Sequence, residues 1–245
     1  MYIDRIEIDR DKIQKNARNA YVFELPSLRN LKSLTLEKPV TFLVGENGTG
    51  KSTLLGAIAV AYGFSPEGGS KNFGFSTQQN HSELYQSLRF TKSAFPKDGF
   101  FLRAESFYNV ATTIDEMDGY SGGASSFIQN YGGRSLHEQS HGESFLALVL
   151  NRFWGKGLYL LDEPEAALSP TRQLSLIAQM GELIKDHSQF IIATHSPILM
   201  AYPDADILVL SEQGIHQTAY EETEHYKITK QFLDNPGRML RELLD

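Results

Sequence analysis

The chain has 245 residues, a formal net charge of −7 and no cysteine. Its length suits one large α/β domain, and the lack of cysteine excludes disulfides, thiolate metal sites and thiol chemistry. The acidic balance argues against a protein that binds nucleic acid over its whole surface. No apolar run reaches the ~20 residues of a membrane span. We therefore expect a cytoplasmic globular protein without membrane insertion.

The N-terminal region predicts two strands, at 2–8 and at 31–36, and the second leads into an apolar run at 40–44. A segment with helical spacing follows at 53–61. The stretch 63–80 is rich in Gly, Ser, Asn and Gln and is typical of a long loop. This half of the chain thus begins with strands and continues into a helix.

Two further strands, at 84–90 and 99–104, are separated by a turn and predict a β-hairpin. Beyond a helix at 108–118, short apolar strands alternate with helices, which predicts a mostly parallel sheet. We expect one domain over 1–245, with a helical lobe at about 106–153. The later elements are expected as helices at 144–153 and 171–187, strands at 158–161, 189–193 and 207–210, and one or two short helices within 221–245.

Residues 45–52 read G-E-N-G-T-G-K-S, a complete G-x-x-x-x-G-K-S phosphate loop between the strand 40–44 and the helix 53–61. Strand, glycine loop and helix form the arrangement that this motif requires. Backbone N–H groups and the helix N-terminus then face phosphate oxygens. Lys51 is expected to pair with the β- and γ-phosphates, and Ser52 to be a ligand of Mg²⁺. The expected nucleotide-binding residues are Asn47, Gly48, Thr49, Gly50, Lys51, Ser52 and Thr53.

Two adjacent acids, Asp162 and Glu163, follow the apolar strand 158–161. A buried parallel strand that ends here delivers both carboxylates to the edge of the sheet where ligands bind. Asp162 is expected to hold Mg²⁺, directly or through water, and Glu163 to act as the general base on the attacking water. On this segment alone, a solvated acidic turn is an equal alternative, and the phosphate loop upstream favours the functional interpretation.

The segment S-H-G-E at 140–143 opens the helix that precedes the acidic strand. Ser140 would lie at a helix N-terminus, which favours anions, and Gly142 would let the backbone come close to a phosphate. Ser140 and Glu143 also have the spacing of a capping box, in which the two residues bond each other across the first helical turn. On this segment alone the capping box is the better interpretation.

His195 follows the apolar run 189–193, which we expect to lie beside the acidic strand. A histidine at a strand end is often only an ordinary polar residue. At this edge of the sheet, however, it could hydrogen-bond the γ-phosphate or the attacking water. We therefore name His195, together with Glu163, as an expected catalytic residue.

Taken together, these segments resemble the ABC-type ATPases of the SMC/RecF-like group, which includes the AAA_21-like predicted ATPases. D-E-P at 162–164 is similar to the Walker B motif, and A-A-L-S at 166–169 to the D-loop. S-H-G-E is similar to the signature motif in its S-x-G-E form, and His195 to the switch histidine. The resemblance covers 38–60 and 134–200, in the order that the family has.

The resemblance implies an α/β P-loop NTPase fold: an ABC-ATPase-type, mostly parallel sheet with an antiparallel N-terminal subdomain and a small helical lobe. It also implies Mg²⁺-dependent hydrolysis of ATP. In this family the signature contacts the γ-phosphate held by a second subunit. Ser140, Gly142 and Glu143 are therefore expected to act in trans, in a homodimer that closes on ATP with two composite sites.

One part of the family pattern is missing. ABC ATPases have a glutamine where the antiparallel strands meet the helical lobe, and it touches Mg²⁺ and senses the partner subunit. Here the strand 99–104 ends in Glu105-Ser106, with no glutamine. Glu105 is the expected equivalent by topology, while Gln78 and Gln79 have the right chemistry further upstream.

What hydrolysis drives is open on the sequence alone. The first hypothesis is an ATPase that couples to a partner effector protein, in a defence or repair system. The second is a DNA-clamping ATPase that acts directly on duplex, and the third is the nucleotide-binding subunit of a membrane transporter. The net charge of −7 lowers the second. The S-x-G-E signature lowers the third, because transport subunits of the family usually carry L-S-G-G-Q.

Overall fold

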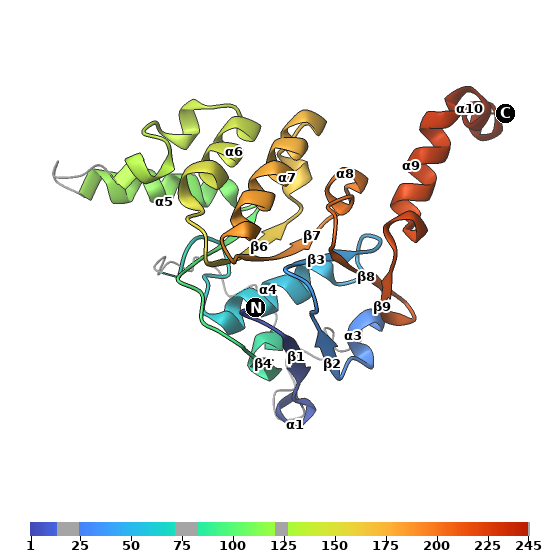
Figure 1. Ribbon diagram of the computed structural model, residues 1–245, viewed down its shortest axis with the longest axis horizontal. Coiled ribbons are helices and arrows are strands. Elements are labelled where there is room, and N and C mark those ends of the chain that lie inside the picture. The colour runs from blue at the N-terminus through green and yellow to red at the C-terminus, as the bar shows by residue number, and fades with distance from the viewer. Residues whose placement is uncertain (14–24, 72–82, 121–126, 245) are drawn as a thin grey trace.

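The protein is described from a computed structural model, which covers residues 1–13, 25–71, 83–120 and 127–244 (Figure 1). Its centre is a six-stranded sheet with the order β5-β6-β7-β3-β8-β9. The first five strands run parallel, and β9 pairs antiparallel with β8. The strands are β5 (Asp98–Arg103), β6 (Gly157–Asp162), β7 (Gln189–Ala193), β3 (Val40–Val44), β8 (Asp206–Ser211) and β9 (Gly214–Thr218).

A second sheet is antiparallel and comes from the N-terminal part of the chain. It has the order β2-β1-β4, formed by Ser33–Thr35, Arg5–Ile8 and Leu88–Thr91. The expected hairpin between the strands at 84–90 and 99–104 is wrong, because β4 pairs with β1 while β5 pairs with β6. β5 has four consecutive buried residues and joins the central sheet, whereas β4 has only one buried residue and joins the antiparallel sheet.

The central sheet is buried on both faces, and its strands are accordingly apolar along their whole length. All residues of β3, β6 and β7 are buried. Alternate residues belong to two separate apolar clusters. One cluster packs against α5 (Phe107–Tyr120), α6 (His141–Arg152) and α7 (Pro170–Lys185), and the other against α4 (Lys51–Tyr62) and the antiparallel sheet. Figure 1 shows these helices on opposite sides of the sheet.

The 3-10 turns Phe127–Tyr131 and Leu136–Glu138 lie between α5 and α6 in the chain and contact both helices. At the C-terminal end, α9 (Glu224–Asp234) and α10 (Pro236–Leu244) have no buried side chain among their described residues, and α9 extends away from the sheet (Figure 1). The remaining helices are short: α1 (Arg10–Ile13), α3 (Pro26–Arg29) and α8 (Pro197–Met200), with 3-10 turns at Glu83–Ser87, Pro164–Ala166 and Tyr220–Glu222.

The fold class expected from the sequence is confirmed: a mostly parallel α/β sheet accompanied by an antiparallel N-terminal sheet and several helices. The consequence for function lies in the strand order. β3, β6 and β7 end at the same edge, so the segments that follow them in the chain are brought together there. In the described part of the chain, no helix is both long and apolar enough to pass through a membrane.

Candidate functional site

The glycine loop leaves β3 and enters α4, and two of its glycines are required by geometry. Gly45 has φ 140°, and a Cβ atom added there would lie 2.3 Å from the carbonyl oxygen of Leu210 in β8. Gly50 has φ 96° and caps the N-terminus of α4. Residues with a side chain rarely adopt these angles. The loop is therefore packed onto the sheet with its backbone N–H groups at a helix N-terminus, which is the arrangement of an anion site.

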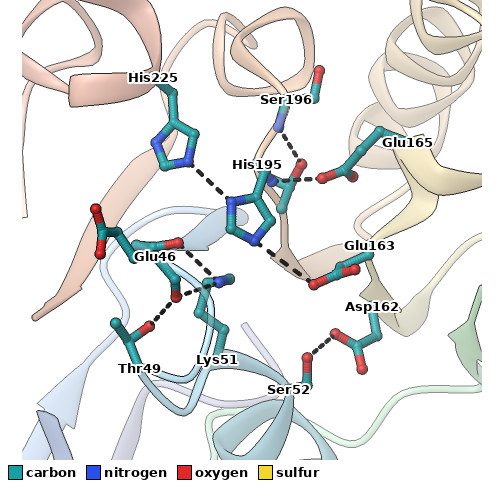
Figure 2. A network of polar contacts seen from close by, with 12 residues as sticks. Glu46, Thr49, Lys51, Ser52, Asp162, Glu163, Glu165, His195, Ser196 and His225 are labelled. Atoms are coloured by element: carbon teal, nitrogen blue, oxygen red, sulfur yellow. Dashed lines mark hydrogen bonds and ion pairs between the residues drawn. The ribbon is translucent and has the colours of Figure 1, made fainter.

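The side chain of Lys51 is folded over the same loop (Figure 2). Its ammonium group donates to the carbonyl oxygens of Gly45 at 2.8 Å and Glu46 at 3.0 Å. Burial lowers the pKa of Lys51, while the nearby carboxylates of Glu163 and Asp162 act in the opposite direction. The loop thus holds a buried positive charge that is partnered by backbone oxygens.

Ser52, the next residue of α4, meets Asp162 at the end of β6. Its hydroxyl group donates to Oδ1 of Asp162 at 2.8 Å, as Figure 2 shows. Burial raises the pKa of Asp162; Arg103 and the Ser52 bond lower it, whereas the charges of Glu163 and Glu105 raise it further. The phosphate loop and the acidic strand end therefore form one site.

Arg103 was not predicted from the sequence as part of this site. It is the last residue of β5 and lies directly opposite Asp162 in the register of β5 and β6. Its Nε atom is 3.3 Å from Oδ2 of Asp162, and its Nη2 atom is 2.6 Å from Oε1 of Glu105. Gln78 and Gln79 lie outside the described residues. A pocket of about 320 Å³ is lined by Ser52, Arg103, Ala104, Glu105, His141, Asp162, Glu163 and Ala166.

Glu163 and His195 face each other across the ends of β6 and β7. The Nε2 atom of His195 is 3.7 Å from Oε1 of Glu163. Glu163 has φ 50°, the left-handed region, and its backbone N–H donates to the carbonyl oxygen of Ala193 at 2.9 Å. The turn after β6 is thereby tied to β7, and the Glu163 carboxylate is directed toward the imidazole ring (Figure 2).

Two neighbours of His195 were missed by the sequence reasoning. The carboxylate of Glu165 accepts the backbone N–H of His195 at 2.5 Å, and burial raises the pKa of Glu165. On the other side, Nδ1 of His195 is 3.0 Å from Nε2 of His225 in α9. Glu165 follows Asp162-Glu163 closely in sequence, so its proximity to the site could have been predicted. Nothing in the sequence near His225 connects it to His195.

The segment 140–143 forms the N-terminus of α6, and its own hydrogen bonds are local. The carboxylate of Glu143 accepts from the backbone N–H of Ser140 at 3.1 Å and from its hydroxyl group at 2.6 Å. Glu143 also lies 3.1 Å from Arg172. A Cβ atom on Gly142 would lie 2.7 Å from the carbonyl oxygen of Ala167, so glycine lets α6 pack against the turn after β6.

The structure therefore brings five of the expected residues together: Lys51, Ser52, Asp162, Glu163 and His195. Among the described residues, no hydrogen bond or ion pair joins Ser140 or Glu143 to that group. Asn47 lines a second cavity of about 510 Å³, between the glycine loop and α9. Within the described ranges, no three His, Cys, Asp or Glu side chains gather as a metal site of their own.

Comparison with known families gives two matches. Residues 23–115 match a family described as an AAA domain. Residues 128–201 match a second family, described as an AAA domain, putative AbiEii toxin, of a type IV toxin–antitoxin system. The first match contains the glycine loop, and the second contains Ser140, Asp162, Glu163 and His195.

Curated relatives extend over most of the chain. A putative ABC transporter ATP-binding protein of Caldanaerobacter subterraneus subsp. tengcongensis is 27% identical over 219 residues, which is 81% of this chain and 87% of the relative. A cobalt import ATP-binding protein of Salmonella paratyphi A is 27% identical over 199 residues, 75% of this chain and 72% of the relative.

Solved structures show the same fold at low sequence identity. An SMC head bound to the C-terminal winged-helix domain of ScpA has a TM-score of 0.50 at 15% identity, covering 89% of this chain and 98% of that one. An ATP-binding cassette of an ABC transporter has a TM-score of 0.50 at 18% identity, covering 91% and 93%.

The fold, with a glycine loop and an acidic strand end at one edge of the sheet, defines the chain as a P-loop ATPase. Each family match covers less than half of the chain, and the resemblance to ABC-type ATPases that the sequence motifs predicted is found again in the curated relatives and in the fold.

Proposed function

We propose that this ATPase domain closes as a head-to-tail homodimer on two ATP molecules and uses their hydrolysis to drive a partner protein. The observation that carries the proposal is the convergence of the glycine loop, the end of β6 and the end of β7. Ser52 and Asp162 are joined by a 2.8 Å hydrogen bond, and Glu163 faces His195 at 3.7 Å.

The phosphates are proposed to lie along the glycine loop, from Asn47 to Thr53. Backbone N–H groups at the N-terminus of α4 supply donors, and the helix dipole favours negative charge there. The ammonium group of Lys51 already lies over the loop, bonded to two carbonyl oxygens. In the complex it exchanges these neutral acceptors for phosphate oxygens, which form stronger, charge-assisted bonds.

The residues present fit Mg²⁺. The hydroxyl of Ser52 and the carboxylate of Asp162 are hard oxygen ligands that already converge. Burial and the charges of Glu163 and Glu105 raise the pKa of Asp162, while Arg103 and the Ser52 hydrogen bond lower it, and a bound cation would further stabilise its charged form. Bound Mg²⁺ would supply the electrostatic stabilisation of the phosphate charge that such sites use. We propose Ser52 and Asp162 as its protein ligands, with Glu105 as the residue in the glutamine-loop position.

Glu163 is proposed as the general base that takes a proton from the attacking water, and His195 as the residue that bonds the γ-phosphate or that water. The side chain of Glu163 is partly exposed, so water can reach it. The backbone of His195 is held in place by the hydrogen bond from its N–H to the carboxylate of Glu165. Such fixed placement of groups around a transferring phosphate is the main source of catalysis in this reaction class.

The second half of each site is proposed to come from the other copy of the chain. The hydroxyl group of Ser140 donates to Glu143, which also pairs with Arg172 in α7, and Ser140 is exposed at the start of α6. With Gly142, Ser140 and Glu143 would face the γ-phosphate held on the glycine loop of the second copy. The hydroxyl group of Ser140 would then exchange its bond to Glu143 for one to phosphate.

We infer an effector protein as the partner, in keeping with the toxin–antitoxin description of the family that matches 128–201. The transporter alternative is favoured by the names of the curated relatives, which are ATP-binding proteins of ABC transporters. Direct action on duplex DNA is the third candidate, and the net charge of −7 argues against it.

The proposed hydrolysis and dimer closure are tested by Glu163→Gln, which keeps the shape of the side chain and removes the base. We expect ATP binding to persist, turnover to fall by at least about 100-fold, and a dimer to accumulate with ATP and Mg²⁺ in size-exclusion chromatography with light scattering. Glu182→Gln, an exposed change on α7, is the matched control. A Glu163→Gln protein that remains monomeric under saturating ATP contradicts the paired site.

The partner is tested separately, by the ATPase rate of the wild-type protein with and without duplex DNA. Stimulation that disappears steeply as salt is raised would support the DNA clamp. A rate that DNA does not change, but that a co-purifying protein raises, would support the effector hypothesis. A requirement for a membrane-embedded partner would support the transporter alternative.

A further inference from the structure

The contact between His195 and His225 joins the end of β7 to the C-terminal helix α9. The Nδ1 atom of His195 and the Nε2 atom of His225 are 3.0 Å apart, within hydrogen-bond distance (Figure 2). His225 lies in the first turn of α9, and Thr223 caps this helix through a bond from the backbone N–H of Tyr226 at 3.3 Å. The ring of His225 is thus placed by a defined helix start.

An N···N hydrogen bond between two neutral imidazoles has one proton, carried by one ring or the other. The opposite nitrogen of His195, Nε2, is buried and has no hydrogen-bond partner among the described residues. The group that faces it is the carboxylate of Glu163, at 3.7 Å. A carboxylate, like a phosphate, only accepts hydrogen bonds. The arrangement is therefore favourable when Nε2 of His195 carries a proton and Nδ1 does not.

We propose that His225 is a positioning residue: its Nε2–H donates to Nδ1 of His195 and thereby fixes His195 as the tautomer with its proton on Nε2, aimed at Glu163 and the γ-phosphate. The inference rests on the role proposed above for His195 and adds the residue that orients it. A histidine ring is commonly fixed in this way, since the bond made by one nitrogen sets the state of the other.

The surrounding charges are consistent with a neutral pair. Burial and the charge of Lys51 lower the pKa of both histidines. The charge of Glu163 raises the pKa of His195, and the charges of Glu224 and Glu46 raise the pKa of His225.

The pair also forms part of the wall of the cavity between the glycine loop and α9. This cavity is lined by Glu46, Asn47, His195, Glu224, His225, Ile228 and Thr229. Since the side chains of α9 are at most partly buried, a change at His225 should leave the apolar core intact. We therefore expect such a change to affect turnover and not the stability of the fold.

Two substitutions separate the hydrogen bond from the bulk of the ring. His225→Phe keeps a ring of similar size and removes the donor. His225→Gln supplies an amide N–H at about the reach of Nε2 and can restore the bond. Lys227→Ala, exposed on the same helix and paired with Glu222, is the control. Urea unfolding of each variant shows whether it is folded before its activity is compared.

We expect His225→Phe to lower kcat roughly tenfold at unchanged KM, an effect of the size of one lost hydrogen bond. His225→Gln should recover most of this loss, and Lys227→Ala should equal the wild type. A wild-type kcat for folded His225→Phe overturns the proposal. So does a folded His225→Gln protein that is as impaired as His225→Phe, because supplying a donor would then not restore turnover.

The tautomer itself is read by NMR of the wild-type protein labelled with ¹⁵N-histidine, with His195→Gln used for assignment. We expect a protonated Nε2 and an unprotonated Nδ1 for His195, and loss of this pattern in His225→Phe. A proton on Nδ1 of His195 overturns the proposal, whatever the activity. A wild-type kcat for His195→Gln would instead refute the catalytic role of His195, and the NMR result then still decides the tautomer.

Discussion

The hydroxyl group of Ser52 donates a 2.8 Å hydrogen bond to Asp162, which lies 110 residues further along the chain. Ser52 lies in α4, which follows β3 through the glycine loop, whereas Asp162 ends β6, and β7 lies between β3 and β6 in the sheet. His195 follows β7 and faces Glu163, the neighbour of Asp162. Three separate stretches of sequence therefore meet at this edge of the sheet, and each can be tested by substitution.

Lys51→Ala should remove most of the affinity for ATP. The ammonium group makes two bonds to the loop, and in the nucleotide complex these become bonds to charged oxygens. A loss of roughly 100-fold in Kd is expected, since a hydrogen bond to a charged group contributes about 1.5–3 kcal/mol. Fluorescence titration with a labelled ATP analogue measures it. Lys185→Ala, an exposed lysine on α7, serves as control, and unchanged affinity in Lys51→Ala would refute the assignment of the loop.

The composite site predicts complementation between two inactive variants. Lys51→Ala lacks a working glycine loop, and Ser140→Ala lacks a working signature. In a mixed dimer, one site combines the intact loop of one chain with the intact signature of the other. Equal mixing should restore about a quarter of the wild-type ATPase rate, because half of randomly formed dimers are mixed and each has one good site of two.

The control for this experiment is a variant in which both substitutions lie in one chain. Mixed with the wild type, it leaves no site intact in the mixed dimer, so each wild-type chain that pairs with it should lose activity. Ser140→Ala also removes a helix-capping residue, with an expected loss of about 1 kcal/mol in the free energy of unfolding. A mixture of the two single variants that stays inactive, with both proteins folded and dimeric, would contradict a site shared between chains.

Glu165 should make stability depend on pH in a specific direction. Burial raises the pKa of its carboxyl group above the ordinary value of 4.5. The folded state therefore keeps a proton that the unfolded chain has lost, so this group's contribution to stability is present below about pH 4.5 and is lost as pH rises. Glu165→Gln, which is never charged, should unfold at higher urea than the wild type at neutral pH. The difference should shrink as the pH falls toward 4.5.

A second change at this residue separates stability from positioning. Glu165→Ala removes the acceptor of the His195 backbone N–H, so we expect a loss of about 1–3 kcal/mol in the free energy of unfolding together with a lower kcat. Glu165→Gln retains an acceptor and should keep most of its turnover. If alanine and glutamine give the same kcat, the bond from the His195 backbone does not position the ring.

The central strands could be predicted because burial on both faces leaves a direct mark on the sequence. The apolar runs at 40–44 and 189–193 became β3 and β7 with the expected bounds. The glycine loop was equally clear, since Gly45 and Gly50 adopt angles that few other residues allow. Both signals are local, so they do not depend on the path of the rest of the chain.

Partners distant in sequence could not be predicted in the same way. The strands β4 and β5 are close in sequence and show hairpin spacing, but they belong to different sheets. β9 was not expected, because Gly214–Thr218 is largely polar and pairs only at the edge of the sheet. The pairing register of β5 with β6 places Arg103 at the site. His225 is placed there because the chain returns along β9 to α9. Neither position carries a motif of its own.

Glu163 occupies a backbone conformation that its own side chain makes unfavourable. At φ 50° a residue with a Cβ atom is strained by about 1–3 kcal/mol relative to a conformation it prefers, and a glycine would relieve much of this strain. The same change would remove the carboxylate that faces His195. The backbone and the proposed chemistry therefore favour different residues at one position. Laboratory evolution for heat resistance alone would accept the loss of Glu163, so screens of this protein need turnover as a second criterion.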